Sequence, residues 1–405
     1  MYLARQGLCS SSRFRLLSRH LRSPARKLSS LAKIKDDLLA RVYEPIPDCP
    51  TPIPSFLLSR TFHDVFPPRY KDLFRDGAIY QSAVSEALRW TSNQCSTSLL
   101  DAVCPPPTYN LLYFPTPTVL SSLLSDGTDT RHSPGPPFTR RVWAGCKISH
   151  PEPLHFLATG SKASCHERVL DVIFKGPPGN ENVYVIIGRS FSQENLMDDC
   201  TLEEFRTLVF MRDNKNSQTS HAPYVAAADR DTSTRSRKVL RSARKRPDFS
   251  HTLTASTALL FRFSALTFNA HAIHLDREYC QSVEGHRSLL VHGPLTTILM
   301  AELLRIHLAD RITQGHVHAR VEEASTSGCS YIVPRLTQIH TRNLMPLYAD
   351  EPMTIYGRRL ERSIGALDDH DQSKGKELWE LWIDNSDGSC AVKATAETTR
   401  LPHRV

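Results

Sequence analysis

The strongest periodic pattern in the chain is helical and lies at residues 294–312, PLTTILMAELLRIHLADRI. Apolar residues occupy almost every face of this segment, interrupted in its middle turns by Glu302 and Arg305. A helix that is apolar nearly all round is buried rather than surface-lying. Gly293 and Pro294 favour a helix start, because proline at the first helical position sacrifices no hydrogen bond. We therefore expect one long buried helix here.

Other segments have the patterns of β-strands. The C-terminal residues 377–398 alternate apolar and polar side chains around an Asn-Ser-Asp-Gly turn, which predicts a hairpin with one buried face. Residues 257–268, TALLFRFSALTF, are expected to form a strand that enters a turn at 269–276, NAHAIHLD. In the first half, residues 116–127 suggest one brief helix. Further strand-like segments, enriched in β-branched and aromatic residues, are 140–150, 169–176, 181–191 and 351–359.

These elements predict an α+β protein. One long buried helix wrapped by several antiparallel strands is the arrangement of a hot-dog fold. A chain of 405 residues has room for two or three domains. We expect a leader at 1–35, a sheet-dominated hot-dog-like domain at 36–212, a basic linker at 213–250 and a catalytic hot-dog domain at 251–405.

The formal net charge of +8 is concentrated at the start of the chain. Residues 1–35 contain nine Lys or Arg and no carboxylate, so the remainder has 41 basic and 42 acidic residues. The leader is rich in Arg and Ser, and Leu16, Leu17 and Leu21 can share one helical face. This composition is typical of a mitochondrial presequence, with a disordered basic arm as the alternative. The charge therefore does not indicate a nucleic-acid partner, and we expect a location in the mitochondrial matrix.

Several other classes are disfavoured. No uninterrupted apolar run reaches the length of a membrane-spanning helix. The ten cysteines contain no CxxC pair or finger-like Cys/His spacing, and a matrix protein is not expected to form structural disulfides. His271, His274, His286 and His292 lack the carboxylate partners of a closed ligand set. We expect no metal and no cofactor.

The basic linker is open to two interpretations. Its polar composition is that of a solvated connection. The alternative is a landing surface for an acidic carrier domain or a phosphate-containing thioester carrier. Its basic residues cluster near the end: Arg235, Arg237, Lys238, Arg241, Arg244, Lys245 and Arg246.

Six segments resemble one known family. FRFSALTFNAHAIH, EGHRSLLVHGPL and LWIDNSDGSCAVKA in the second half, with YNLLYFPTP, LSDGTD and PGPPFTRRVWAGC in the first, are similar to the hydroxyacyl-thioester dehydratase type 2 proteins of fungal mitochondria. These belong to the MaoC-like hydratase-dehydratase group, so the resemblance implies a double hot-dog architecture and hydro-lyase chemistry on acyl thioesters. Residues 317–338 depart from the family and are interpreted as an insertion.

The residue types fit this chemistry. Dehydrating a 3-hydroxyacyl thioester requires a proton shuttle with a suitable pKa and stabilisation of negative charge on the thioester oxygen. Histidine supplies the first, and backbone N–H groups at a helix N-terminus supply the second. We expect the strand to aim His274 at a site where Gly293 forms the oxyanion hole. A side chain at 293 would block the thioester.

The resemblance also assigns roles within the turn. The MaoC-like motif is Asp-x-Asn-Pro-x-His, in which Asp and His share a catalytic water. His274 matches that histidine, Asn269 stands in place of the aspartate, and His271 stands in place of the asparagine. An amide cannot exchange a proton at neutral pH, so His274 is expected to act as both base and acid with Asn269 as orienter.

Alternatives remain for the supporting residues. His271, His292 and Asp276 are candidates for a second layer around His274, with Asp276 either accepting its other N–H or lying on the surface. Ser264 is interpreted as a turn cap. Arg140, Arg141 and Trp143 are interpreted as structural, with contact to a pantetheine phosphate as the alternative.

Four functions stay open at this stage. The leading one is a mitochondrial (3R)-3-hydroxyacyl-[acyl-carrier-protein] dehydratase of type II fatty-acid synthesis. The others are a hydratase of a mesaconyl- or itaconyl-like CoA ester, a non-catalytic acyl-carrier-binding protein, and a thioesterase, which Asn269 disfavours. The expected partner is a thioester of acyl-carrier protein or CoA, bound by a monomer with two hot-dogs or a homodimer.

Overall fold

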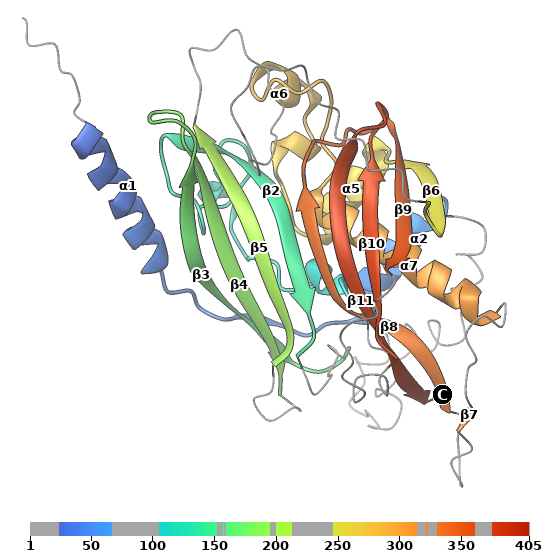
Figure 1. The fold of residues 1–405 in the computed structure, drawn as a ribbon. Coiled ribbons are helices and arrows are strands. Elements are labelled where there is room, and N and C mark those ends of the chain that lie inside the picture. Colours follow the sequence, from blue (N-terminus) through green and yellow to red (C-terminus); the bar gives the residue numbers. More distant parts are fainter. Residues whose placement is uncertain are drawn as a thin grey trace, which may run out of the picture.

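The computed structural model describes residues 24–66, 105–151, 157, 159–194, 200–212, 246–313, 321–322, 330–360 and 375–404. Its strands form one antiparallel sheet of 11 strands in the order β1-β3-β4-β5-β2-β8-β11-β10-β9-β6, with β7 paired to β8 (Figure 1). The strands are β1 (Ile46–Asp48), β2 (Phe138–Ser149), β3 (Ala163–Lys175), β4 (Asn182–Gln193), β5 (Cys200–Arg212), β6 (Phe249–Thr254), β7 (Val321–Glu322), β8 (Ser330–Asn343), β9 (Pro352–Leu360), β10 (Glu377–Asp384) and β11 (Cys390–Arg404).

Helices lie on and around this sheet. They are α1 (Pro24–Leu39), α2 (Pro52–Phe62), α5 (Thr257–Leu266), α6 (Arg277–Ser282) and α7 (Gly293–Thr313). Short 3-10 turns are η2 (Tyr109–Leu112), η3 (Leu120–Ser122) and η4 (Ala272–His274). Among the described residues, no helix is long and apolar enough to cross a membrane.

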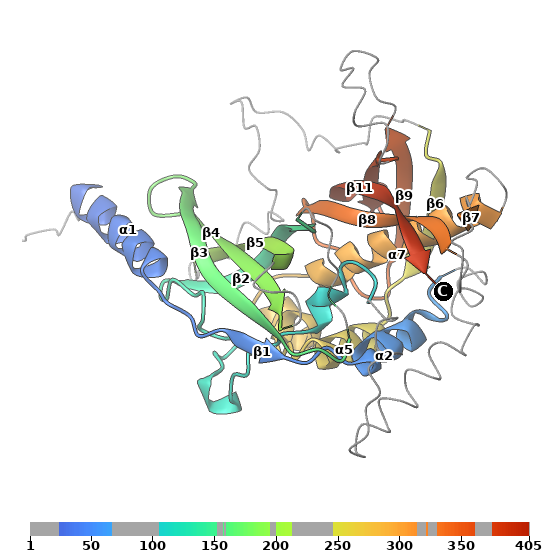
Figure 2. The same cartoon turned by 90° about the horizontal axis from the view of Figure 1, so that it is seen from below.

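The long helix predicted at 294–312 is confirmed as α7. It lies between the curved sheet of the C-terminal half and a layer formed by α2 and α5 (Figure 2). Leu295, Ile298 and Leu299 are fully buried, as expected for a helix covered on all sides. Even Glu302 is buried, and its charge is paired with Arg305 at 2.6 Å. The hot-dog arrangement of helix and sheet is therefore present in this half.

The two halves join through β2 and β8. Residues 145–149 of β2 pair with residues 338–342 of β8, which makes the sheet continuous. The interpretation of 317–338 as an insertion is wrong for residues 330–338, because they form part of β8 and pair with β11 along their length. Residues 317–320 and 323–329 lie outside the described residues.

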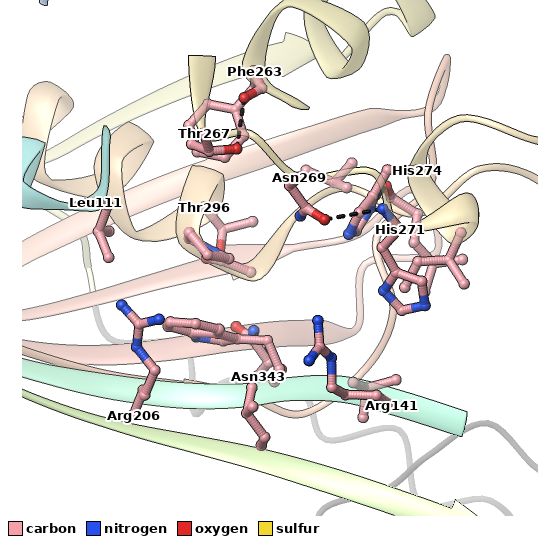
Figure 3. A pocket seen from close by; sticks show the side chains of 18 of the residues that line it. Leu111, Arg141, Arg206, Phe263, Thr267, Asn269, His271, His274, Thr296 and Asn343 are labelled. Atoms are coloured by element: carbon pink, nitrogen blue, oxygen red, sulfur yellow. Dashed lines mark hydrogen bonds between the residues drawn. The ribbon is translucent and has the colours of Figure 1, made fainter. Parts of the chain in front are cut away.

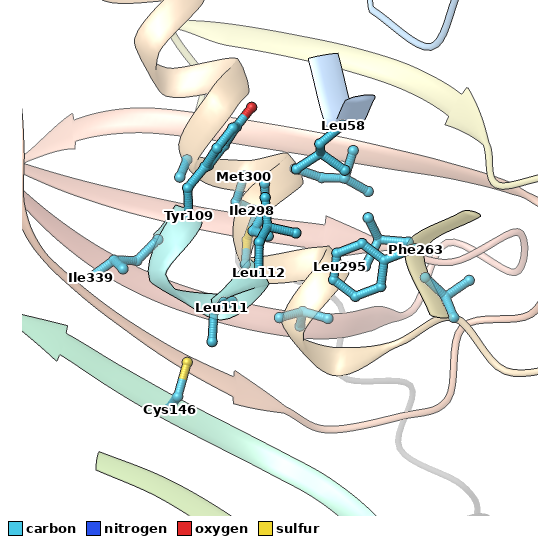
Figure 4. Close-up of a cluster of buried hydrophobic side chains, with 14 of the residues drawn as sticks. Leu58, Tyr109, Leu111, Leu112, Cys146, Phe263, Leu295, Ile298, Met300 and Ile339 are labelled. Atoms are coloured by element: carbon cyan, nitrogen blue, oxygen red, sulfur yellow. The ribbon is translucent and has the colours of Figure 1, made fainter. Parts of the chain in front are cut away.

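A shared core fills the space between the halves. Turn η2 of the first half packs Leu111 and Leu112 toward α7, next to Cys146 of β2 and Ile339 of β8 (Figure 4). Side chains from α2 and α5 complete the cluster (Figure 4). Burial of this apolar surface stabilises the contact between halves.

The strand expected at 257–268 is wrong, because this segment forms helix α5. Ser256 caps it by accepting a hydrogen bond from the Leu259 N–H at 3.2 Å. Leu260 and Phe263 are buried while Phe261 is 64% exposed, which follows the helical repeat rather than strand alternation. A short apolar run fits either element, and here packing against α2 decided for the helix.

The structure confirms the other predicted strands and shortens one predicted helix. The hairpin of β10 and β11 is confirmed, with Asn385 and Ser389 closing the turn. The strands expected at 140–150, 169–176, 181–191 and 351–359 are confirmed as parts of β2, β3, β4 and β9. The brief helix expected at 116–127 is reduced to the 3-10 turn η3.

Helix α1 crosses the expected end of the leader. Leu31 and Ile34 pack against the apolar cluster of the first half, and Leu38 is fully buried in it. Lys35 forms an ion pair with Asp171 of β3 at 2.7 Å. Residues 1–23 and most of the basic linker, 213–245, lie outside the described residues, so the domain division stays a prediction.

Candidate active site

A cavity of about 270 Å³ lies between the two halves. One wall comes from the loop after α5 and the start of α7, with Asn269, His271 and His274 (Figure 3). The facing wall carries Arg141 from β2, Arg206 from β5 and Asn343 from β8 (Figure 3). The predicted site residues of the second half therefore converge on a cavity that the first half completes.

His274 is held with one ring nitrogen tied and the other left to the cavity. It ends the 3-10 turn η4, and its Nδ1 lies 2.8 Å from the carbonyl oxygen of Leu290. A carbonyl only accepts, so in the neutral ring Nδ1 carries the hydrogen and Nε2 has a lone pair. This is the tautomer that a general base requires.

Burial keeps this imidazole neutral. The pKa of His274 is lowered to about 4, chiefly by desolvation and in part by the Arg141 guanidinium, while the hydrogen bond to Leu290 acts in the opposite direction. Its side chain is therefore unprotonated at neutral pH. That state can accept a proton but cannot donate one before catalysis begins.

His292 supports His274 by stacking. The two ring centroids are 3.6 Å apart with an interplanar angle of 19°. The His292 Nε2 lies 2.8 Å from the hydroxyl of Ser264, so Ser264 holds this histidine and does not act as the expected turn cap. Burial and the neighbouring rings of His274 and His271 hold the pKa of His292 well below its usual value. His292 thus fits the expected second layer.

Asn269 is fixed by its own loop. Its Oδ1 accepts the backbone N–H of His271 at 3.0 Å, which leaves the Nδ2 amide as the group available to the cavity. The preceding residue, Phe268, has φ +53°, an unusual conformation for a bulky side chain. This backbone is part of what turns Asn269 toward His274.

Asp276 does not contact His274. Its Oδ1 accepts the Tyr279 N–H at 2.9 Å and caps α6, and the residue is exposed. The carbonyl oxygen of Leu290, and not Asp276, accepts the hydrogen bond from His274 Nδ1. Of the two alternatives for Asp276, the second-layer role is wrong and the surface position is confirmed, because the carboxylate points into the first turn of the next helix.

Gly293 begins α7 at the cavity wall. A Cβ there would lie 2.5 Å from Asn343 Nδ2 and 2.6 Å from Trp143 Cδ1. The absence of a side chain is thus required by packing against the facing wall, a reason that sequence reasoning did not give. Gly293 and Pro294 line the cavity, so the positive end of the α7 helix dipole lies at the site.

From the sequence, the RRVWAG residues of the facing wall are interpreted as structural, but two arginines of this wall lie at the cavity. Arg206 pairs with Glu204 at 2.6 Å and lies over the ring of Trp143 at 4.8 Å. Arg141 has a single ion pair, to Asp129 at 3.2 Å. Its proximity lowers the pKa of both His271 and His274. The segment RRVWAG drew attention to Arg141 and Trp143 but not to their position opposite His274, and no sequence signal pointed to Arg206.

Within the described ranges, no three His, Cys, Asp or Glu side chains converge as a metal site would require. The cavity combines a neutral base, an amide and the guanidinium groups of Arg141 and Arg206 with the carboxylates of Asp129 and Glu167.

Comparison with known proteins identifies the family. The model of the hydroxyacyl-thioester dehydratase type 2 family matches residues 108–317, about half of the chain. The chain belongs to this family. The matched range contains the loop with His274 and Asn269, the start of α7, and Arg141 of the facing wall.

Two relatives are similar to about half of the chain each. The chain is 32% identical over 204 residues to the mesaconyl-C(4)-CoA hydratase of Chloroflexus aurantiacus, covering 50% of this chain and 65% of the relative. It is 30% identical over 209 residues to the mitochondrial hydroxyacyl-thioester dehydratase type 2 of Schizosaccharomyces pombe, covering 49% and 66%. Each match thus spans just under two thirds of the relative.

A solved structure supports the fold. A MaoC-like dehydratase superposes with a TM-score of 0.51 at 12% identity, covering 90% of this chain and 99% of that one. The α+β double hot-dog architecture is therefore confirmed over most of the chain.

Proposed function

We propose that the chain is a hydro-lyase that removes water from a (3R)-3-hydroxyacyl thioester to give the trans-2-enoyl thioester. The observation that carries the proposal is the neutral His274, with Nδ1 fixed by Leu290 and Nε2 left to the cavity. Family membership supports the same reaction class.

Three groups carry out the elimination: the His274 ring, the Gly293 backbone and the Asn269 amide. His274 Nε2 takes the proton from C2 of the substrate, and the backbone N–H of Gly293 at the start of α7 stabilises the charge that develops on the thioester oxygen. The C3–O bond breaks, and the protonated His274 returns the proton to the leaving hydroxyl, which departs as water. The Nδ2 amide of Asn269 orients that hydroxyl. One histidine thus supplies both base and acid, and hydration is the reverse path.

We further propose that the substrate is carried by acyl-carrier protein in type II fatty-acid synthesis of the mitochondrial matrix. Two observations support this setting. The leader has a presequence composition. The S. pombe relative is named as mitochondrial.

A second candidate is hydration of a CoA ester whose acyl group bears a carboxylate. It is favoured by Arg141 and Arg206, which face the cavity opposite His274. Guanidinium groups bind carboxylates well, and a relative is named for a mesaconyl thioester. The two candidate functions therefore differ in whether the acyl group of the substrate bears a carboxylate.

The deciding experiment presents the full chain with matched 3-hydroxyacyl groups on acyl-carrier protein and on CoA. Formation of the conjugated enoyl thioester is followed in the ultraviolet. We expect turnover that favours the carrier, falls by about 10³-fold or more in His274→Ala, and falls by roughly 10-fold in Asn269→Ala. Circular dichroism checks that each variant is folded.

Other results redirect the assignment. Turnover on CoA alone, highest with a carboxylated acyl group, would favour the second candidate. Near-normal turnover in a folded His274→Ala variant would remove His274 from the mechanism. If the folded wild-type chain turned over neither substrate, the result would favour a non-catalytic acyl-carrier-binding protein.

A further inference from the structure

A loop of the first half reaches across to the loop that carries His274. The backbone carbonyl of Asp126 accepts the Ala272 N–H at 2.8 Å. Gly127 follows with φ +79°, and a Cβ there would lie 2.0 Å from the carbonyl oxygen of Ala270. The two backbones are thus in direct contact, and only glycine allows this approach.

The Asp126 carboxylate is aimed at His271. Its Oδ1 accepts both the N–H and the hydroxyl of Thr128, at 2.9 and 2.7 Å. Its Oδ2 lies 3.6 Å from His271 Nε2, and the two side chains are 5% and 6% exposed. Neither of these two atoms has a hydrogen-bond partner among the residues that the structure describes.

Two buried polar atoms that face each other without partners destabilise the fold, because neither regains the hydrogen bond that it made with water. A movement of well under 1 Å would join them in a hydrogen bond of normal length. The carboxylate can only accept, so the pairing requires the hydrogen on His271 Nε2.

We infer that Asp126 is a positioning residue of the active site, which fixes the tautomer and ring orientation of His271. With Nε2–H directed to Asp126, His271 Nδ1 has a lone pair and can accept a hydrogen bond from a hydroxyl group in the cavity. The ring stands edge-on to His274, with centroids 5.6 Å apart. The backbone N–H of His271 donates a hydrogen bond to Asn269 Oδ1. By fixing His271, Asp126 therefore acts on both His271 and Asn269.

The first test reads the tautomer directly. The full chain is labelled with ¹⁵N-histidine, and the ring nitrogen shifts of His271 are assigned by comparison with His271→Gln. We expect the Nε2–H tautomer in the wild type and its loss in Asp126→Asn, whose amide can donate to Nε2. This readout needs no turnover, so it stands apart from the proposed reaction. A wild-type His271 with hydrogen on Nδ1 would overturn the inference.

The second test is kinetic and rests on the proposed function. Asp126→Asn is expected to lower kcat by about 10- to 100-fold with little change in KM, as for other groups that orient a functional histidine. The matched control is Arg41→Ala, which loosens the same loop elsewhere by removing hydrogen bonds to the carbonyls of Arg131 and Ser133. It should lower the melting temperature and leave both kcat and the His271 tautomer near wild type.

Two kinetic results would contradict the positioning role. One is a kcat loss in Arg41→Ala equal to that in Asp126→Asn. The other is wild-type kcat in a folded Asp126→Asn variant. If no variant or wild-type chain turns over, the proposed reaction fails while the tautomer measurement still decides the role of Asp126.

Discussion

At the scale of single residues, burial gives His274 its properties. A histidine in water titrates near pH 6.5 and is partly protonated at neutral pH. In this site the ring is buried and near Arg141, and both conditions lower its pKa by disfavouring the charged form. His274 is therefore neutral at neutral pH, which is the form that can accept a proton.

This gives a prediction for the pH profile. The base form of His274 is present above its pKa and lost as pH falls through it. With that pKa at about 4, the acid limb of kcat/KM should have its midpoint near pH 4 and not near 6.5. The measurement is kcat/KM from pH 3.5 to 8, with stability of the fold checked at each pH. A midpoint at 6–7 in the folded enzyme would show that His274 is not the free base that the structure indicates.

At the scale of elements, helix α1 is part of the folded unit. Its apolar residues Leu31, Ile34 and Leu38 recur at helical spacing and meet the cluster that contains Val169 and Val185 of the first half. The ion pair of Lys35 adds little by itself, since both partners are about two-fifths exposed. Burial of the leucine face therefore holds the helix.

We predict that Leu38→Ala destabilises the protein by about 2–5 kcal/mol, because it removes a fully buried side chain and leaves a cavity. The neighbouring Leu39 is 39% exposed, so Leu39→Ala should change stability by about 0.5 kcal/mol or less. Chemical denaturation of the two variants compares them. Equal effects would show that α1 is not packed on the sheet.

At the scale of the whole molecule, a buried ionic network stands behind the facing wall of the cavity. Glu204 is fully buried and binds Arg189 at 3.1 Å, Arg206 at 2.6 Å and the Asn110 amide at 3.1 Å. It thereby ties β4, β5 and turn η2 together. Removing one member leaves buried charges unpaired.

Glu204→Gln should therefore cost about 3–5 kcal/mol in the free energy of unfolding, although the side chain keeps its shape. Glu203→Gln, one position earlier and half-buried, provides the control and should have a small effect. Both are measured by urea denaturation at pH 7. A Glu204 variant as stable as the control would mean that the network contributes nothing to stability.

The sequence by itself determined the parts that depend on local pattern. The apolar period of α7, the turn chemistry of the β10–β11 hairpin and the β-branched and aromatic residues of β2, β3 and β4 each identify one element without its neighbours. The motif around Asn269 and His274 and the start of α7 at Gly293 were found in the same way. Family resemblance then assigned the double hot-dog architecture.

Tertiary structure decided everything that depends on contacts between distant segments. Packing on α2 made residues 257–266 a helix, and pairing with β11 made 330–338 part of strand β8. Leu290 replaced Asp276 as the partner of His274, and Ser264 came to hold His292. Arg141 and Asp126 became site residues because a continuous sheet brings the first half against the second. The physical reason is that burial, partner choice and pKa are set by atoms far away in the chain, which local patterns do not specify.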